Sequence, residues 1–280
     1  DLMSCWNLID TNLRECLLKK FISDKGLSEA ANFIKSIENG QNLFKTEQYD
    51  NCGKTYLVLS SNLLFFPFEA ISTFKNQTLS RFVSYDHLIK HLSAHSNNQA
   101  YAFKDISVSN DLFYLINPDG TLGKCQNRME SFFHGQLKCF KGSIGIFDKL
   151  KSFNYNRAGL LVYCGHGDGK NYIQQVIDSM EKSISCCSFL LFGCSSIKLH
   201  QEPRFDCEGL AMTLISLGTP VVGGFLWQIF DSDSDNFTTG LLNKIFAENL
   251  NFNIALNQTK NTTKFRCLSP SSFVIYGSAE

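Results

Sequence analysis

Three apolar runs in the second half of the chain constrain its fold more than any other feature. Residues 160–164 are followed by Gly-His-Gly-Asp-Gly, and residues 189–192 are followed by Gly-Cys-Ser-Ser. The third run, residues 221–227, is followed after three further residues by alternating Asp and Ser. Unbroken apolar runs of this length are typical of strands buried on both faces of a parallel sheet. Because such sheets bind ligands beyond the carboxyl ends of their strands, the polar clusters should meet at one edge.

The rest of the chain alternates between strand and helix patterns. This alternation predicts an α/β fold with a mostly parallel sheet and right-handed crossovers. Further strands are expected at 56–59, 112–116 and 273–276, and helices at 84–95, 172–180, 210–217 and after residue 235. A short helix should open near residue 67, and residues 124–157 should hold mixed helical pieces. We interpret residues 1–54 as a helical segment, the end of an upstream region, and residues 55–280 as one domain.

The composition argues against several classes of protein. A formal net charge of +0 gives no bulk attraction to nucleic acid or to an anionic membrane surface. No apolar run approaches the ~20 residues of a membrane span, and the N-terminus has none of the features of a signal peptide. The chain begins with Asp1 rather than Met, which is consistent with a fragment of a longer protein.

The cysteines indicate an intracellular protein. There are 11, an odd number, and several lie inside apolar runs, where cysteine usually acts as a small hydrophobic residue. This pattern favours reduced thiols over a disulfide framework. Asn-x-Thr sequons would then be chance matches without glycans. They are Asn76, Asn236, Asn257 and Asn261.

A histidine and a cysteine at strand ends are the strongest candidates for chemistry. His166 lies between Gly165 and Gly167, and glycines allow a sharp turn and close approach of a substrate. Cys194 precedes Ser195, where the next helix is expected to begin, so the helix dipole should make the thiol more acidic. An imidazole nearby could accept the thiol proton and leave a nucleophilic thiolate.

The acidic run after the third strand has two interpretations. Asp231, Asp233 and Asp235 have the spacing that opens an EF-hand loop, but Asn236 and Leu242 stand where that loop needs Gly and Glu. One of the Asp or Ser side chains could cap the following helix. Alternatively, the carboxylates could line a pocket beside the cysteine and bind an Arg or Lys side chain of a substrate. The second interpretation predicts a Cys–His peptidase that cuts after a basic residue.

Two metal hypotheses are weaker. The helix expected at 84–95 carries His87, His91 and His95, which could bind a metal or form a solvent-facing stripe opposite the apolar residues. The apolar residues of this helix are Leu88, Ile89 and Leu92. A zinc site could also use Cys and His residues near the strand ends, but their spacing is not that of a zinc finger. They are Cys164, His166, Cys186 and Cys187. We therefore expect neither a metal nor a cofactor.

The motifs resemble those of the C-terminal protease domain of separase, a family of caspase-like cysteine endopeptidases. The resemblance is strongest at residues 163–169, 191–196 and 218–235. It is weaker at 66–69, 115–118 and 276–277, and it spans about residues 55–280 in the same order. This resemblance implies a caspase-like three-layer α/β/α fold.

Residue by residue, the resemblance implies a complete catalytic site. His166 would be the general base and Cys194 the nucleophile, and the backbone amides of Gly167 and Cys194 would form the oxyanion hole. Asp235 matches the position that receives the arginine at P1, the residue before the scissile bond. Asp231 and Asp233 match acidic positions of the same segment and are candidate substrate-binding residues.

The resemblance also implies partners. The family cuts after Glu-x-x-Arg in the kleisin subunit of cohesin, which releases sister chromatids at anaphase. Its inhibitor, securin, occupies the cleft as a pseudo-substrate. A member of this family is expected in the nucleus and the cytoplasm, without direct nucleic-acid or membrane binding.

Three departures from the family pattern bear on the shape of the acidic segment and not on the Cys–His pair, and two alternative functions stay open. Gln228 stands where the family usually has Asp, Phe230 where it has Thr, and Phe68 where it has Trp. One alternative is a different caspase-like peptidase of the CHAT type, with another specificity. The other is a catalytically silent binding module on the same fold.

Overall fold

The chain consists of two compact units, Asp1–Thr55 with Phe66–Leu79 and Tyr56–Phe65 with Ser80–Glu280. The structure, a computed structural model, describes residues 55–59, 63–70, 79–96, 111–145, 158–179, 187–200, 207–260, 263–264 and 268–278. The predicted helical segment, residues 1–54, lies outside these ranges. The 3-10 helix η2 (Phe68–Ala70) begins just after Pro67, where the sequence predicts a short helix. No helix of the described ranges is long and apolar enough to span a membrane.

The described strands form one eight-stranded sheet in the order β1-β2-β8-β7-β6-β5-β3-β4. Pairing is parallel from β7 through β6, β5 and β3 to β4, and also between β2 and β8. Strand β8 runs antiparallel to β7, so the sheet is mostly parallel, as predicted. The strands are β1 (Thr55–Val58), β2 (Leu79–Phe82), β3 (Asp111–Ile116), β4 (Phe140–Ile144), β5 (Ala158–Cys164), β6 (Ser188–Leu191), β7 (Val221–Phe225) and β8 (Phe273–Gly277).

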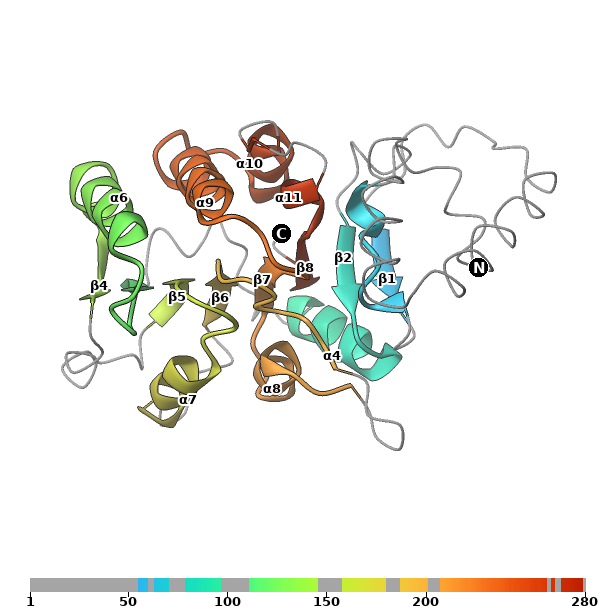
Figure 1. Cartoon of the computed structure of the whole chain (residues 1–280). Coiled ribbons are helices and arrows are strands. Elements are labelled where there is room, and N and C mark those ends of the chain that lie inside the picture. The colour runs from blue at the N-terminus through green and yellow to red at the C-terminus, as the bar shows by residue number, and fades with distance from the viewer. Residues whose placement is uncertain are drawn as a thin grey trace, which may run out of the picture. The chain divides into compact units, whose positions relative to one another are not determined.

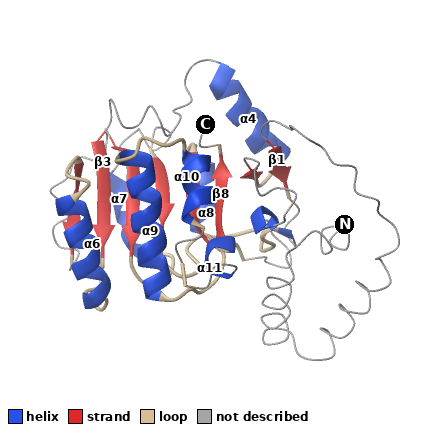
Figure 2. Ribbon diagram, turned by 90° about the horizontal axis from the view of Figure 1, so that it is seen from above, coloured by secondary structure: helices blue, strands red, loops and turns tan. Residues whose placement is uncertain are grey.

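Helices cover both faces of this sheet and make the predicted three-layer α/β/α arrangement (Figure 1). Helices α6, α9, α10 and α11 lie on one face, and α4, α7 and α8 lie on the other. Figure 2 shows α6, α9 and α10 on the near side of the strands. The helices are α4 (Tyr85–Ser96), α6 (Gly123–Gly135), α7 (Lys170–Ser179), α8 (Leu210–Ser216), α9 (Asp231–Phe246), α10 (Phe252–Thr259) and α11 (Leu268–Ser271).

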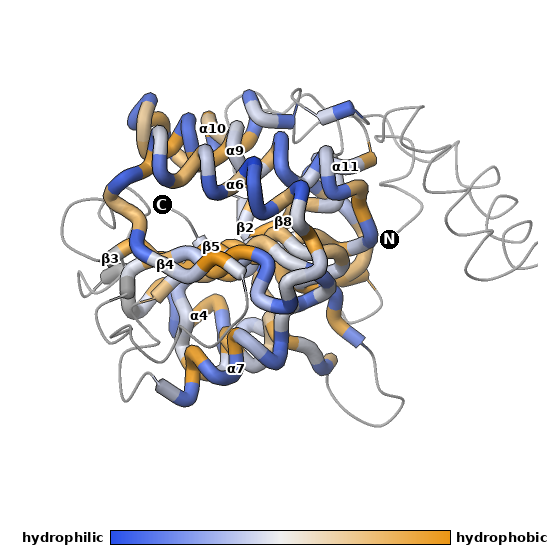
Figure 3. The backbone as a smooth tube through the Cα atoms, turned by 60° about the vertical axis from the view of Figure 1, so that its left-hand side comes forward, coloured by the Kyte–Doolittle hydropathy of each residue, from blue (hydrophilic) through white to orange (hydrophobic). Residues whose placement is uncertain are grey.

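The central strands are buried on both faces, which explains their unbroken apolar sequences. In β5, Leu160 and Val162 belong to the core under α6, α9 and α10, whereas Leu161 and Tyr163 belong to the core over α7 and α8. All four side chains are fully buried. Figure 3 shows the contrast, with mainly hydrophobic colour along the strands and mixed colour along the helices.

The three apolar runs of the sequence are adjacent parallel strands. Tyr163 of β5 pairs with Leu191 of β6, and Leu191 pairs in turn with Gly224 of β7. The polar clusters that follow β5 and β6 therefore leave the sheet at the same edge, as predicted. Sheet register, rather than proximity along the chain, brings these clusters together.

Two strands were not predicted because their sequences are polar. Strand β4 (Phe-Lys-Gly-Ser-Ile) is an edge strand with alternating burial, and residues 124–157 were expected to hold helical pieces. Its Gly142 lies against Tyr114 of β3, so that a Cβ there would be 2.0 Å from the Tyr114 carbonyl oxygen. Strand β2 contains the fully buried Arg81, whose Nη1 donates to the Leu64 carbonyl oxygen at 2.7 Å.

Helix α4 is in its predicted place, but the prediction of its buried face was wrong. His91 is buried, whereas Ile89 and Leu92 are 59% and 40% exposed. The imidazoles of His87 and His91 pack on the ring of Phe82 from β2, with centroids 5.0 and 5.3 Å apart from it. The contact of the two imidazoles with Phe82, and not the apolar pattern of the helix, therefore decides which face of α4 is buried. The three-histidine metal hypothesis includes His95, whose side chain lies outside the described part of the chain.

Burial of His87 predicts a loss of stability in mild acid. Burial, and then the positive charge of Lys90, lowers the pKa of His87 from 6.5 to about 4. The unfolded chain therefore binds the proton more tightly, so stability is complete above pH 6.5 and falls toward pH 4. The loss is at most about 3 kcal/mol, and less because the ring is partly exposed and solvent screens its charge. Urea unfolding across this range measures it.

Urea unfolding of two variants over the same pH range tests whether His87 is the group responsible for this pH dependence. His87→Gln should flatten the slope between pH 6.5 and pH 4, because the group that titrates is removed. His200→Gln, at an exposed histidine, should leave the slope unchanged. If His87→Gln leaves the slope intact, another group is responsible.

Candidate active site

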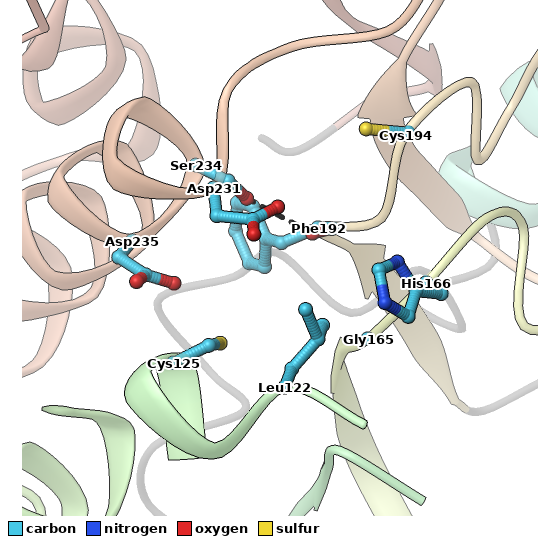
Figure 4. Close-up of a pocket in the computed structure, with 9 residues that line it drawn as sticks. All are labelled: Leu122, Cys125, Gly165, His166, Phe192, Cys194, Asp231, Ser234 and Asp235. Carbon is cyan, nitrogen blue, oxygen red and sulfur yellow. Dashed lines mark hydrogen bonds between the residues drawn. The ribbon is translucent and has the colours of Figure 1, made fainter. Parts of the chain in front are cut away.

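Four segments that are distant in the sequence line one pocket at the carboxyl edge of the sheet (Figure 4). His166 and Cys194 lie toward one side of it, and Asp231, Asp235 and Cys125 lie toward the other. The lining residues are Leu122, Cys125, Gly165, His166, Phe192, Cys194, Asp231, Ser234 and Asp235. The structure thus brings together the histidine, the cysteine and two of the three aspartates that the sequence singles out.

The loop that carries His166 wraps around the ring of Tyr163. The Tyr163 hydroxyl donates to the His166 carbonyl oxygen at 2.6 Å. Burial raises the pKa of Tyr163, and nearby acidic groups such as Asp119 raise it further, so the phenol stays a donor. A Cβ at Gly165 or at Gly169 would lie 2.5 Å from Tyr163 atoms. The glycines are therefore needed for close approach to this ring, and His166 is left exposed at the mouth of the pocket.

Cys194 lies in a turn and not at a helix N-terminus, so the predicted acidification by a helix dipole does not apply. Residues 194–197 form turns, and Ser195 has a left-handed backbone with φ 56°. The Ser195 amide donates to the Trp227 carbonyl oxygen at 3.1 Å, and the Ser196 hydroxyl accepts from the Phe225 amide at 3.1 Å. These bonds anchor the turn to β7 and to the residues that follow it. The hydrogen bond to the Ser196 hydroxyl explains why a serine is needed there.

The His166 loop and the Cys194 turn touch through their backbones. A Cβ on Gly193 would lie 1.9 Å from the Gly167 carbonyl oxygen and 2.9 Å from that of Gly165. Glycine at 193 therefore allows this contact. Among the described residues, the amides of Gly167 and Cys194 donate no hydrogen bond to another residue, so both remain available to a ligand.

The Cys194 thiol is half-buried and hydrogen-bonded to the backbone. Its Sγ donates to the Ile229 carbonyl oxygen at 3.2 Å. A second thiol, Cys125, also lines the pocket. Burial, and then the negative charge of Asp235 and a hydrogen bond to it, raises the pKa of Cys125 far above its usual range. Burial likewise raises the pKa of Cys164, so neither of these two thiols forms a thiolate near neutral pH.

Helix α9 begins at Asp231, whereas the sequence predicts a helix only after residue 235. Its N-cap is Phe230, which makes no side-chain capping bond, so the hypothesis that an Asp or Ser caps this helix is wrong. The acidic run therefore forms the first turns of the helix, where the dipole stabilises negative charge. Ser234 donates to the Phe192 carbonyl oxygen at 2.9 Å and so joins the helix to the end of β6.

The three aspartates have different surroundings. Asp233 is buried, and its two oxygens accept from the Lys264 amide at 3.0 Å and the Ser269 hydroxyl at 2.6 Å. It does not line the pocket. Asp235 lines the pocket and forms an ion pair with Arg128 of α6. Asp231 is exposed, lines the pocket, and forms no hydrogen bond or ion pair with the residues that the structure describes.

The sequence did not identify three residues that hold this site together. Tyr163 was assigned to the core of a strand, although its hydroxyl supports the His166 loop. Asn117 directly follows the strand predicted at 112–116, and it donates to the Gln126 side chain at 2.8 Å and accepts from the Leu122 amide at 2.9 Å. No motif in the sequence singles out Arg128, which pairs with Asp235. Of the three, Asn117 has a sequence signal, because asparagine is enriched in the left-handed backbone conformation, and its φ here is 49°.

Comparison with known proteins defines the class of this domain. Residues 10–234 match the family described as Separin, protease domain. The domain therefore has the fold of a separin protease domain. The chain belongs to the separin protease-domain family. The match begins within residues 1–54, the segment that is expected to lie upstream of the domain.

Relatives are similar along most of this chain but are much longer. Separin of Saccharomyces cerevisiae is 26% identical over 239 residues, which are 80% of this chain and 14% of that protein. Separin of Schizosaccharomyces pombe is 27% identical over 81% of this chain and 13% of that protein. Separin of Mus musculus is also 27% identical, over 66% of this chain and 9% of that protein. A crystal structure of the Saccharomyces cerevisiae separase-securin complex has a TM-score of 0.67 at 24% identity. The structural match covers 89% of this chain and 16% of the separase chain in that crystal structure, and it supports the assignment of the fold.

Proposed function

We propose that this domain is a cysteine endopeptidase that cuts peptide bonds after arginine, with Cys194 as nucleophile and His166 as general base. The observation that carries the proposal is that both residues line one pocket together with Asp231 and Asp235. The thiol, the imidazole and the carboxylates come from three different elements of the fold. Membership of a protease-domain family supports the same activity.

The proposed reaction has two halves. The Cys194 sulfur leaves the Ile229 carbonyl oxygen, because that oxygen accepts from the thiol but would repel a thiolate. His166 takes the proton, and the thiolate attacks the scissile carbonyl carbon. His166 then returns the proton to the leaving amine, which gives a thioester on Cys194. Water, activated by the same imidazole, hydrolyses the thioester and restores the free thiol.

The amides of Gly167 and Cys194 are proposed as the oxyanion hole. Both remain free of bonds to other described residues, and the Gly193–Gly167 contact holds their two segments together. Two backbone donors aimed at the developing negative charge stabilise the tetrahedral intermediate more than the ground state. The proposed pocket for the P1 arginine contains Asp231 and Asp235 but not Asp233, whose carboxylate is used elsewhere.

The relatives support a proposal for the substrates and partners of this domain. We propose that sites of the form Glu-x-x-Arg in a kleisin subunit of cohesin are cleaved, as the family resemblance implies. Solved relatives are separase-securin complexes, which supports a securin-type pseudo-substrate as an inhibitor. Such substrates are consistent with action in the nucleus and the cytoplasm.

A peptide panel tests the specificity. The full chain is incubated with fluorogenic peptides that carry Glu at P4 and Arg, Lys, Asp or Leu at P1, and with a matched peptide that carries Gln at P4. We expect cleavage after Arg, weaker cleavage after Lys because its ammonium cannot form a bidentate bond, and none after Asp or Leu. Cleavage after Leu or Asp would favour a caspase-like peptidase of another specificity. No cleavage of any peptide, with Cys194 unlabelled by an active-site probe, would favour a silent binding module.

A further inference from the structure

The side chain of Tyr163 joins the interior of the sheet to the peptide group between His166 and Gly167. Its ring is fully buried. Its backbone is held on two sides, by pairing with Leu115 of β3 and by the Phe192 amide, which donates to the Tyr163 carbonyl oxygen at 2.8 Å. The hydroxyl donates to the His166 carbonyl oxygen at 2.6 Å. A fixed part of the sheet is therefore bonded to the exposed loop at the mouth of the pocket.

This bond acts on the amide that is proposed to bind the oxyanion. The carbonyl of His166 and the N–H of Gly167 belong to one planar trans peptide group, so they point in opposite directions. Because the carbonyl is bonded to Tyr163, the N–H has to point away from the Tyr163 hydroxyl. That N–H donates to no other residue in the described part of the chain, so it is available to a substrate.

Residue 167 by itself does not fix the orientation of this peptide group. Gly167 has a left-handed backbone with φ 61°, and a Cβ there would meet no atom within 4 Å. Glycine adopts positive and negative φ about equally readily, so the peptide group before it can rotate without a steric penalty from a side chain. Among the described residues, Tyr163 is the only donor to the His166 carbonyl oxygen. The orientation of the Gly167 amide therefore depends on the Tyr163 hydroxyl.

We propose that Tyr163 is a positioning residue that orients the Gly167 amide toward the oxyanion of the tetrahedral intermediate. The proposal rests on the proposed function, because it assigns a role within the same active site. The hydroxyl also polarises the peptide group, which makes the N–H a stronger donor. Burial raises the pKa of the Tyr163 phenol, so the hydroxyl keeps its proton and continues to donate near neutral pH.

Tyr163→Phe tests this role, because phenylalanine keeps the packed ring and removes only the hydroxyl. We expect kcat for the Glu-x-x-Arg peptide to fall by about tenfold to a hundredfold, close to the loss of one oxyanion donor. KM should stay unchanged, because the interaction is made in the transition state. Iodoacetamide labelling of Cys194, followed by mass spectrometry, is the second readout. In this alkylation the sulfur displaces iodide and no oxyanion forms, so the rate should remain that of the wild type.

Tyr114→Phe is the matched control on the adjacent strand β3. The Tyr114 hydroxyl lies 3.5 Å from Nε2 of His134, and Tyr114 does not line the pocket. This variant should cleave as the wild type does. Thermal unfolding is measured for every variant, and both readouts are taken below each unfolding transition.

A second substitution acts on the same peptide group from its other end. Gly167→Ala adds a Cβ that meets no atom but disfavours φ 61°, so it should favour a rotated peptide group and lower kcat. Combined with Tyr163→Phe, it should cost little more than either substitution alone, because both lose the same orientation.

Three results would overturn the proposal. Tyr163→Phe could cleave as fast as the wild type, or its cleavage and iodoacetamide labelling could fall equally, which would mean that the hydroxyl supports the Cys–His pair and not the oxyanion hole. The losses from Tyr163→Phe and Gly167→Ala could also multiply in the double variant, which would mean that they act separately. Failure of the proposed function is distinct, because the wild type would then cleave no peptide.

Discussion

Replacing Cys194 by serine is expected to lower kcat/KM for a Glu-x-x-Arg peptide by at least about 10⁴-fold. The serine hydroxyl is a far weaker acid than the thiol, so the imidazole of His166 cannot produce the nucleophile at neutral pH. The thiol is half-buried and donates to the Ile229 carbonyl oxygen, an acceptor that a serine hydroxyl can also use, so the substitution should leave the fold intact. Steady-state cleavage of the fluorogenic peptide, with thermal unfolding measured alongside, gives both values.

The matched control is Cys139→Ser, the same substitution at an exposed cysteine outside the pocket. It should cleave as the wild type does. His166→Asn should reproduce most of the loss seen in Cys194→Ser, and the two together should cost little more than either alone, because they act as a unit. A Cys194→Ser protein that cleaves as fast as the wild type would show that another group is the nucleophile.

Replacing Gly193 by alanine is expected to disable the site without touching any reacting group. The new Cβ would lie 1.9 Å from the Gly167 carbonyl oxygen and 2.9 Å from that of Gly165. Both are backbone atoms on either side of His166, so the loop has to move rather than a flexible side chain. A displacement of about 1 Å can cost about 10²-fold in rate, and overpacking typically costs about 1–3 kcal/mol of stability. We expect both effects, measured by peptide cleavage and by urea unfolding.

Gly135→Ala is the control for this substitution. A Cβ at Gly135, near the end of α6, meets no atom within 4 Å. It should leave cleavage unchanged and leave stability the same or slightly higher, because alanine is a better helix former than glycine. If Gly193→Ala is as active and as stable as Gly135→Ala, the two backbone segments do not need the close contact that the structure has.

The strand predictions were confirmed where the sequence is apolar on both faces, because such a segment has to be buried on both sides. The strands at 160–164, 189–192 and 221–227 have no polar residue to place in solvent, so they had to lie inside a sheet. Polar or mixed sequences were ambiguous. The edge strand β4 was expected to be helical, and α4 buries His91 where Ile89 and Leu92 were expected to be buried. In both cases a residue of the neighbouring strand determines the local structure. Tyr114 of β3 packs against β4, and Phe82 of β2 packs against the buried face of α4.

The sequence by itself determined the class of the fold and the residues that could carry chemistry. Glycines beside His166 and an apolar strand before Cys194 are local features, and they indicate a strand end whatever the rest of the chain does. Tertiary structure alone decided which of the three aspartates are bonded within the protein and which one faces the pocket without a partner among the described residues. Asp233 is bonded to residues 31 and 36 positions away, and Asp235 to one 107 positions away. The charge of a carboxylate depends on the partner that the fold brings to it, and no spacing along the chain encodes that partner.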